Sequence, residues 1–293
     1  MTTVEVFAPA KINLTLHITG RRADGYHLID SLVAFAPVGD TVVLRPAQGL
    51  SLSVDGPEAG GVPDNMDNLA LQAGHVLRGD AGLEAALTKR LPAASGIGGG
   101  SADAAAVVRG CLALETGAEA DPTPYLTALT KLGADIPMCL TPAPQRARGI
   151  GEHLVPQPLP ALPAVLVNPR VPVPTAGVFK ALATPQNAPM PDTLPHFSTA
   201  EVLTDWLATQ RNDLEAPAQQ IAPAIGAVLE ALRQTTGCRL ARMSGSGATC
   251  FGLYDSDAAA EAAALAIRQT HPDWWIAHGP LGDQTAVSAP KIS

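Results

Sequence analysis

The chain has few aromatic residues, few cysteines and no long hydrophobic segment. Phe, Trp and Tyr make up 4% of its 293 residues, so alanine, valine and leucine must fill most of a core. The cysteines are scattered, with no CxxC pair, at Cys111, Cys139, Cys238 and Cys250. This spacing argues against a metal cluster and for buried, reduced thiols. No apolar run approaches the roughly 18 residues that cross a membrane, and the first residues lack a signal-peptide pattern. We expect a soluble, cytoplasmic protein with no membrane partner.

Positive charge is also scarce, because 19 Lys and Arg residues face 27 Asp and Glu residues, for a net charge of −8. Sequence-independent binding of nucleic acid needs a basic face, so we expect no nucleic-acid partner. A local basic pocket for a small anionic molecule is compatible with this balance. Hydrophobic residues at 46% and charged residues at 16% predict a folded chain.

Periodicity predicts strands and helices in both halves of the chain. Alternation of apolar and polar residues predicts strands at 4–7, 13–18, 41–46 and 50–56. Helical spacing predicts helices at 67–79, 101–114, 124–133, 200–208, 218–235 and 258–269. This mixture indicates an α+β fold with two domains. The proline-rich segment from Pro156 to Pro174 predicts the boundary between domains at residues 1–157 and 158–293.

The segment "SGIGGGSADAAA" concentrates glycines between Gly96 and Gly100, directly before a predicted helix. Such glycines let backbone N–H groups converge on an anion at a helix N-terminus, which predicts a phosphate-binding loop. The alternative is a tight connection in which glycine permits close packing. Ser101 lies where an N-cap is expected, and its hydroxyl could cap the helix, face a phosphate or metal, or do both. For Asp103 in the first turn, the simpler explanation is that it complements the helix dipole.

Two better-known phosphate loops are excluded, since the chain has no GxxxxGK[ST] motif and this loop does not fit GxGxxG. A second glycine-serine segment, "SGSGAT" at Ser244–Thr249, is explained equally well by a hairpin turn. The two loops together suggest a nucleotide bound between two domains.

Three segments, in this order, resemble the motifs of the GHMP kinases, the family that contains galactokinase, homoserine kinase and mevalonate kinase. They are "PAKINLTL" (Pro9–Leu16), "LPAASGIGGGSADAA" (Leu91–Ala105) and "RMSGSGATCFG" (Arg242–Gly252). Within the family, "GRRADGYH" is typical of the branch that acts on a cytidyl alcohol. "LGADIPMCL", "GIGEHL", "VPTAGVFK" and "RNDLE" also resemble that branch, so the resemblance covers nearly the whole chain.

The resemblance implies a two-domain GHMP kinase fold, with an N-terminal domain like domain 2 of ribosomal protein S5 and a ferredoxin-like C-terminal domain. It implies transfer of the γ-phosphoryl group of ATP, with Mg²⁺, to the 2-hydroxyl of 4-diphosphocytidyl-2-C-methyl-D-erythritol in the non-mevalonate (MEP) isoprenoid pathway. The partners are then ATP and this small cytidyl substrate. The oligomeric state stays open, with a homodimer as one option. No protein metal ligand is predicted, because phosphates can carry most of the coordination of Mg²⁺.

The resemblance assigns two catalytic residues. Asp135 in "LGADIPMCL" matches the family's catalytic base, and phosphoryl transfer needs a group that accepts the hydroxyl proton. From the residues alone, an aspartate ahead of Pro137 is more often a turn residue that bonds its own backbone. Lys11 in "PAKINL" matches the lysine beside that base, although a lysine on a strand normally faces solvent.

The substrate residues implied by the resemblance are Asn13, Tyr26, His27, Thr175 and Phe179. Tyr26 and Phe179 would enclose the cytosine with their rings, and His27 would pair with its edge. Each residue also has an ordinary explanation, since Tyr and Phe pack in cores, a lone His is commonly structural, and Asn13 fits the surface of a strand.

The ATP contacts implied by the resemblance are Gly96, Ile97, Gly98, Gly99, Gly100 and Ser101 at the phosphates, with Asn68 and Lys89 near the adenosine. The family often has Ser at the position of Ala102 and Ala at the position of Ser95. Losing the hydroxyl at Ala102 puts one serine contact to the phosphates in doubt.

Two other functions stay open. Another GHMP kinase, acting on homoserine or mevalonate, would have no reason to keep "GRRADGYH". A catalytically inactive relative that only binds nucleotide would usually lose the base or the lysine, and both Asp135 and Lys11 are present.

Overall fold

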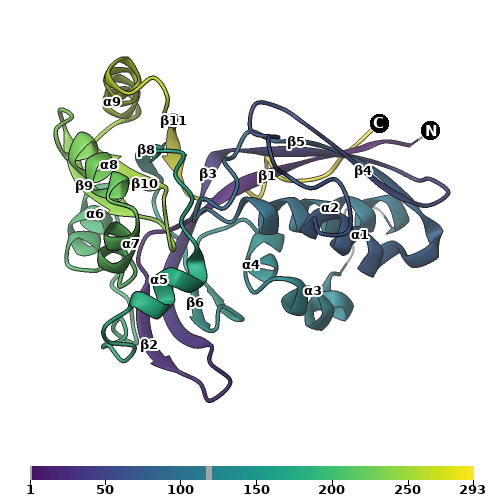
Figure 1. Cartoon of the computed structure of the whole chain (residues 1–293), viewed down its shortest axis with the longest axis horizontal. Coiled ribbons are helices and arrows are strands. Elements are labelled where there is room, and N and C mark those ends of the chain that lie inside the picture. Colours follow the sequence, from purple (N-terminus) through teal and green to yellow (C-terminus); the bar gives the residue numbers. More distant parts are fainter. Residues whose placement is uncertain (1, 117–120) are drawn as a thin grey trace.

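The computed structural model describes residues 2–116 and 121–293. Two lobes lie side by side in Figure 1, and each is built on one β-sheet with helices against it. No helix among the described residues is long and apolar enough to span a bilayer.

The first lobe contains a largely antiparallel sheet in the order β12-β1-β3-β5-β4, with β2 and β6 paired to β3, and β7 paired to β6. Its strands are β1 (Val4–Asn13), β2 (His17–Arg21), β3 (His27–Arg45), β4 (Leu50–Asp55), β5 (Leu83–Thr88), β6 (Gln145–Gly149), β7 (His153–Pro156) and β12 (Lys291–Ile292). Its helices are α1 (Leu69–Arg78), α2 (Gly99–Thr116), α3 (Leu126–Leu132) and α4 (Ile136–Leu140), with 3₁₀ turns at Gly79–Ala81 and Thr123–Tyr125.

The second lobe contains an antiparallel sheet in the order β11-β8-β10-β9. Its strands are β8 (Leu162–Asn168), β9 (Cys238–Met243), β10 (Cys250–Tyr254) and β11 (Trp275–Leu281). Its helices are α5 (Thr175–Ala181), α6 (Ala200–Ala208), α7 (Glu215–Ile221), α8 (Ala224–Arg233) and α9 (Asp257–Thr270). The α+β class predicted from the sequence is therefore confirmed.

The predicted domain boundary falls between β7 and β8, which belong to different sheets. The last strand, β12, nevertheless returns to the first lobe and pairs with β1, so both chain ends lie at the same far edge in Figure 1. The exact boundary stays a prediction.

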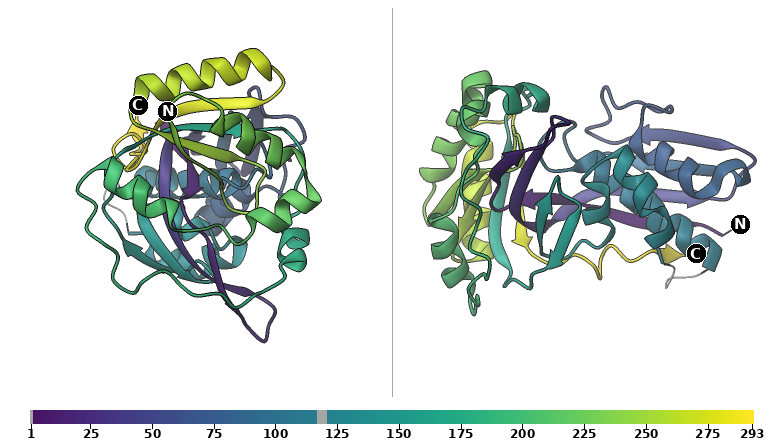
Figure 2. Two further views of the ribbon diagram at one scale, coloured as in Figure 1. Left: turned by 90° about the vertical axis from the view of Figure 1, so that its left-hand side faces the viewer. Right: turned by 90° about the horizontal axis from the view of Figure 1, so that it is seen from below.

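A hydrophobic core joins the lobes. One face of the second sheet, including Phe251 and Leu253, packs with Ile12 and Leu32 from β1 and β3. Helices α7, α8 and α9 cover the other face, on the outer side of the lobe in Figure 2. Because this core contains side chains from both lobes, it fixes the position of one lobe relative to the other.

Three local predictions were wrong in detail. The predicted strand 13–18 is interrupted between the end of β1 at Asn13 and the start of β2 at His17, where Leu16 N donates to Arg211 O in the other lobe at 3.0 Å. The predicted helix 218–235 is two helices, since Pro223 separates α7 from α8. Ser101 is not an N-cap, because α2 begins at Gly99 and Ala102 N donates to Gly98 O at 2.8 Å.

The two glycine-serine loops meet where the lobes join. Gly96 has φ +76°, and a Cβ at this position would lie 2.6 Å from Ser244 O and 2.8 Å from Gly247 N. Thr249 N also donates to Ser95 O at 3.0 Å. Gly96 therefore fills the close-packing role that was left open for the loop, while "SGSGAT" is indeed the turn between β9 and β10.

This close approach predicts that Gly96→Ala destabilises the protein. The added methyl group meets backbone atoms and demands an unfavourable φ, so the free energy of unfolding should fall by roughly 1–3 kcal/mol. Gly100→Ala is the matched control, because Gly100 lies in α2 and a Cβ there would meet Leu69 Cδ1 of α1 at 3.7 Å, an ordinary contact distance. Urea unfolding of the two variants measures the difference, and equal stabilities would contradict the packing role of Gly96.

Candidate active site

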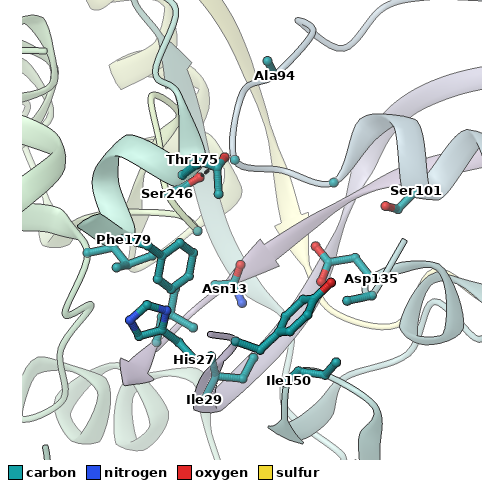
Figure 3. A pocket seen from close by; sticks show the side chains of 18 of the residues that line it. Asn13, His27, Ile29, Ala94, Ser101, Asp135, Ile150, Thr175, Phe179 and Ser246 are labelled. Atoms are coloured by element: carbon teal, nitrogen blue, oxygen red, sulfur yellow. Dashed lines mark hydrogen bonds between the residues drawn. The ribbon is translucent and has the colours of Figure 1, made fainter. Parts of the chain in front are cut away.

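A cavity of about 1270 Å³ lies between the lobes. Figure 3 shows the two ends of this cavity, with His27 and Phe179 at one side, Asp135 and Ser101 at the other, and Asn13 between them. The structure brings together most residues singled out in the sequence: Lys11, Asn13, Tyr26, His27, Gly96, Gly98, Gly99, Gly100, Ser101, Asp135, Thr175 and Phe179 all line it.

Lys11 and Asp135 form an ion pair at one end of the cavity. Lys11 Nζ lies 3.0 Å from Asp135 Oδ2 and donates to Asn13 Oδ1 at 2.8 Å. The Lys11 side chain is 5% exposed, whereas that of Asp135 is 36% exposed and faces the cavity. Lys11 is thus not a solvent-facing lysine. It is buried against the Asp135 carboxylate, which lines the cavity.

Asp135 stands directly before α4, but its carboxylate does not cap that helix. Pro137 fits the first turn, because proline lacks the N–H that would stay unpaired there. The local explanation of Asp135 as a turn residue bonded to its own backbone is therefore not what the structure shows. Its side chain instead pairs with Lys11 and lines the cavity.

Asn13 connects the ion pair to both lobes. Its Nδ2 donates to Ser31 Oγ at 2.8 Å, and its backbone N donates to Ser244 Oγ at 3.0 Å. Ser244 Oγ in turn donates to Gly96 O at 3.1 Å. With 4% exposure, Asn13 is not a surface residue of the strand. It fixes Lys11 relative to the glycine loops.

The aromatic end of the cavity is formed by the β2–β3 turn and α5. The His27 ring stacks on Phe179, with centroids 4.8 Å apart and planes inclined by 26°. Tyr26 lines the same cavity and is 59% exposed, so it is no core residue. Burial, helped by the nearby Arg21 cation, lowers the pKa of His27. His27 is therefore neutral at neutral pH and offers one N–H donor and one acceptor nitrogen.

Helix α5 presents two residues to the cavity from one face. Thr175 and Phe179 are four positions apart, which places them one turn above each other. Thr175 Oγ1 and Ser246 Oγ are 2.9 Å apart and form a hydrogen bond, drawn in Figure 3. The second glycine-serine loop thus adds a hydroxyl to the site.

The start of α2 forms the floor beside Asp135. Gly98, Gly99, Gly100 and Ser101 line the cavity, and the first N–H groups of a helix have no partner within it. These donors and the positive end of the helix dipole suit an anion. Gly96 therefore packs against the other lobe, whereas Gly98, Gly99, Gly100 and Ser101 line the cavity, and the binding of a phosphate by this loop stays a prediction.

Three predicted residues do not line the cavity. Ile97 is fully buried, and only its carbonyl serves the site, by accepting from Lys11 N at 2.9 Å. Asn68 caps α1, where Oδ1 accepts from Ala70 N at 2.9 Å. Lys89 is 3% exposed and ion-paired with Asp40 and Asp103. The adenosine contacts of Asn68 and Lys89 stay predictions.

The ion pairs of Lys89 with Asp40 and Asp103 stabilise the segment that leads from β5 into the glycine loop. Asp40 Oδ1 accepts from Leu91 N at 2.9 Å, and Lys89 Nζ lies 2.7 Å from Asp103 Oδ2 in α2. Burial acts to lower the pKa of Lys89, but the Asp103 and Asp40 carboxylates raise it overall, so this lysine stays charged. Asp103 is thus more than a partner of the helix dipole. It connects α2 to the strand before the loop.

The predicted site residues did not include several lining residues that lie in the quoted segments, among them Arg21, Ile150, Lys180 and Ser246. Arg21 and Lys180 lie beside recognised motif residues, and their charge beside an expected diphosphate was the available signal. Ile150 lies in the quoted segment "GIGEHL", directly after β6, but nothing in its side chain indicated that it would line the cavity.

The donor set fits a magnesium ion held mainly by phosphates. Among residues 2–116 and 121–293, no group of three or more His, Cys, Asp or Glu side chains could hold a metal. Ser101 and Asp135 instead supply oxygen atoms at the same end of the cavity (Figure 3). Mg²⁺ commonly takes one or two protein oxygens plus substrate phosphates and water.

Two family profiles match the chain. The profile described as GHMP kinases N terminal domain matches residues 68–141, and GHMP kinases C terminal matches residues 203–273. The first includes the glycine loop and Asp135, and the second includes "SGSGAT".

Curated relatives are similar over nearly the whole chain. A protein of Roseobacter denitrificans named 4-diphosphocytidyl-2-C-methyl-D-erythritol kinase is 51% identical over 99% of this chain and 97% of its own length. Proteins of the same name are 54% identical in Ruegeria pomeroyi, over 94% of this chain and 98% of the relative, and 55% identical in Cereibacter sphaeroides, over 93% and 97%.

Solved structures agree. A crystal structure of 4-(cytidine 5'-diphospho)-2C-methyl-D-erythritol kinase superposes with a TM-score of 0.72 at 35% identity, covering 95% of this chain and 99% of that one. Homoserine kinase from Cytophaga hutchinsonii superposes with a TM-score of 0.68 at 20% identity, covering 99% and 97%. The second likeness shows the shared fold alone.

Proposed function

The chain belongs to the GHMP kinase family, and we propose that it transfers the γ-phosphoryl group of ATP to the 2-hydroxyl of 4-diphosphocytidyl-2-C-methyl-D-erythritol in the non-mevalonate isoprenoid pathway. Relatives named for this substrate match nearly the full chain at 51% to 55% identity. The observation that carries the proposal is one cavity with an ion pair at one end and an aromatic pair at the other.

Asp135 is the proposed general base. Its carboxylate accepts the proton of the substrate hydroxyl while that oxygen attacks the γ-phosphorus of ATP. The bond from the γ-phosphorus to the bridging oxygen breaks, and ADP leaves. Lys11, 3.0 Å from Asp135 Oδ2, orients the carboxylate and offsets negative charge that develops on the attacking oxygen.

The glycine loop is the proposed seat of the ATP phosphates. The backbone donors at the start of α2 and the Ser101 hydroxyl lie beside Asp135, so a phosphate held there is close to the base. Positioning and charge stabilisation are the main contributions an enzyme makes to phosphoryl transfer. The role of the protein is then to hold the two reactants in line.

Ser101 is the proposed protein ligand of Mg²⁺, with phosphate oxygens supplying most other positions. When bound, Mg²⁺ neutralises part of the negative charge of the phosphates. The protein residues place the phosphates and leave the carboxylate of Asp135 for the proton.

The aromatic end is the proposed site of the cytosine. A flat base can stack on Phe179 or Tyr26, and neutral His27 can both donate to and accept from the edge of the base. Stacking of this kind requires the base to take space beside the His27–Phe179 pair. Thr175 adds a hydroxyl that is hydrogen-bonded to Ser246 of the second glycine-serine loop.

One assay tests the proposed substrate against its rivals. The full chain, with ATP and Mg²⁺, is given the cytidyl alcohol, homoserine or mevalonate, and ADP release is measured. We expect turnover with the cytidyl alcohol, because only this substrate offers both a cytosine for the aromatic end and a hydroxyl for Asp135. Faster turnover of homoserine or mevalonate would contradict the proposal, and ATP binding without any ADP release would identify an inactive relative.

A second prediction concerns the base. Asp135→Asn should lower kcat by roughly 10²–10⁴, the usual effect of losing a general base. The amide keeps the shape of the side chain but cannot take the proton. Asp192→Asn is the control, because the Asp192 side chain is 99% exposed and outside the cavity. Steady-state kinetics measure both variants, and an unimpaired Asp135→Asn protein would remove Asp135 from this role.

A further inference from the structure

Arg109 lies on α2, outside the cavity, and its guanidinium bridges the two elements that carry Lys11 and Asp135. Nη1 donates to Cys139 O in α4 at 2.7 Å, and Nη2 donates to Phe7 O in β1 at 2.9 Å. We infer that Arg109 is a positioning residue, which sets the separation between the base and the lysine without touching substrate. This inference rests on the proposed function and assigns a role to a residue that no sequence motif includes.

The contact with α4 is one helical turn from the base. Cys139 N donates to Asp135 O at 3.3 Å, so the turn that begins at Asp135 ends at Cys139. The last carbonyls of a helix have no partner within it. Arg109 satisfies one of them and thereby fixes the far end of the turn that carries the carboxylate. Figure 1 shows α4 beside α2, as this contact requires.

The contact with β1 lies where the strand is irregular. The register between β1 and β3 shifts between Pro9 and Lys11, and proline has no N–H for the ladder. The sheet alone therefore does not fix Lys11 as firmly as a regular ladder would. Arg109 holds Phe7 on one side of this irregularity, and Ile97 O accepts from Lys11 N on the other.

Helix α2, which carries Arg109, is packed closely against the first sheet. The neighbouring Gly110 brings its backbone against the sheet, since a Cβ there would lie 2.4 Å from Leu44 Cδ1 and 3.1 Å from Val6 Cγ2. The same helix begins at the glycine loop. The Arg109 side chain therefore connects α2, which begins at the glycine loop, to β1, which carries Lys11, and to α4, which follows Asp135.

The chemistry of Arg109 suits positioning rather than pairing with a carboxylate. Among the described residues its recorded acceptors are backbone carbonyls, and its buried Nε has no partner. Burial lowers the pKa of the guanidinium to about 10, which still leaves it charged at neutral pH. Hydrogen bonds from a charged donor are stronger than neutral ones. The planar fork reaches two carbonyls at fixed angles, which a lysine cannot do.

The kinetic test is Arg109→Met, which keeps the apolar stem and removes both donors. We expect kcat to fall by roughly 10- to 100-fold, as misplacement of reacting groups does, with KM for ATP and the cytidyl alcohol nearly unchanged. The control is Arg78→Met, which breaks a 2.6 Å contact between α1 and Glu115 of α2, away from the cavity. An equal loss of kcat in the control, or a loss confined to KM, would overturn the inference.

A double-mutant cycle separates positioning from general loss of structure. In the Asp135→Asn background, Arg109→Met should lower kcat no further, because the base it positions is already gone. The same fold-loss in both backgrounds would show that Arg109 acts independently of Asp135 and would refute the inference.

A crystal structure of the variant tests the same point without activity. We expect the distance from Lys11 Nζ to Asp135 Oδ2 to increase from 3.0 Å to beyond about 4 Å, the limit of an ion pair. An unchanged distance would refute positioning, whatever the substrate of the protein proves to be. If Arg109→Met does not fold, Arg109→Lys takes its place in all three experiments. Lysine keeps the buried positive charge but has a single donor nitrogen, whereas the guanidinium uses two nitrogens to reach the two carbonyls.

Discussion

The ion pair between Lys11 and Asp135 is the constraint on which the rest of the site depends. Its two members come from different elements, a strand and a short helix, and the lysine is buried whereas the carboxylate is not. A buried ammonium group is tolerated only when its charge is paired and hydrogen-bonded. Asn13 and Asp135 supply those partners, and Asn13 is held in turn by Ser31 and Ser244. The need to pair the buried Lys11 ammonium group thus fixes the position of the Asp135 carboxylate, which is partly exposed to the cavity.

The two glycine-serine loops hold the lobes in a fixed relative position, which a site between two lobes requires. Gly96 fits against the Ser244–Gly247 turn with no room for a side chain, whereas Gly98, Gly99, Gly100 and Ser101 line the cavity. The loop is thus a packing connection at Gly96, and we propose that it is an anion site at the start of α2. The shared core of Ile12, Leu32 and Phe251 holds the lobes together beneath it.

Local periodicity and the order of the motifs were sufficient to predict some helices and many of the residues that line the cavity. Helix α6 occupies the predicted range 200–208, and motif residues from three distant segments meet in one cavity. Contacts between distant segments were out of reach. The alternation at 13–18 marks buried side chains, yet the backbone there bonds to Arg211 of the other lobe. Lys89 has the chemistry of a nucleotide contact but is buried between two aspartates, and Arg109 appeared only as one residue of an alanine-rich helix.

In the proposed mechanism, Asp135 takes a proton from one particular hydroxyl while the aromatic end of the cavity holds the cytosine. The most direct measurement is the position of the new phosphate, read by ³¹P and ¹³C NMR on the product formed from ATP and the cytidyl alcohol. The proposed arrangement predicts a phosphate on the 2-oxygen of the methylerythritol unit, with coupling to its quaternary carbon. Phosphate on any other oxygen would contradict it, because the hydroxyl beside Asp135 would then be a different one.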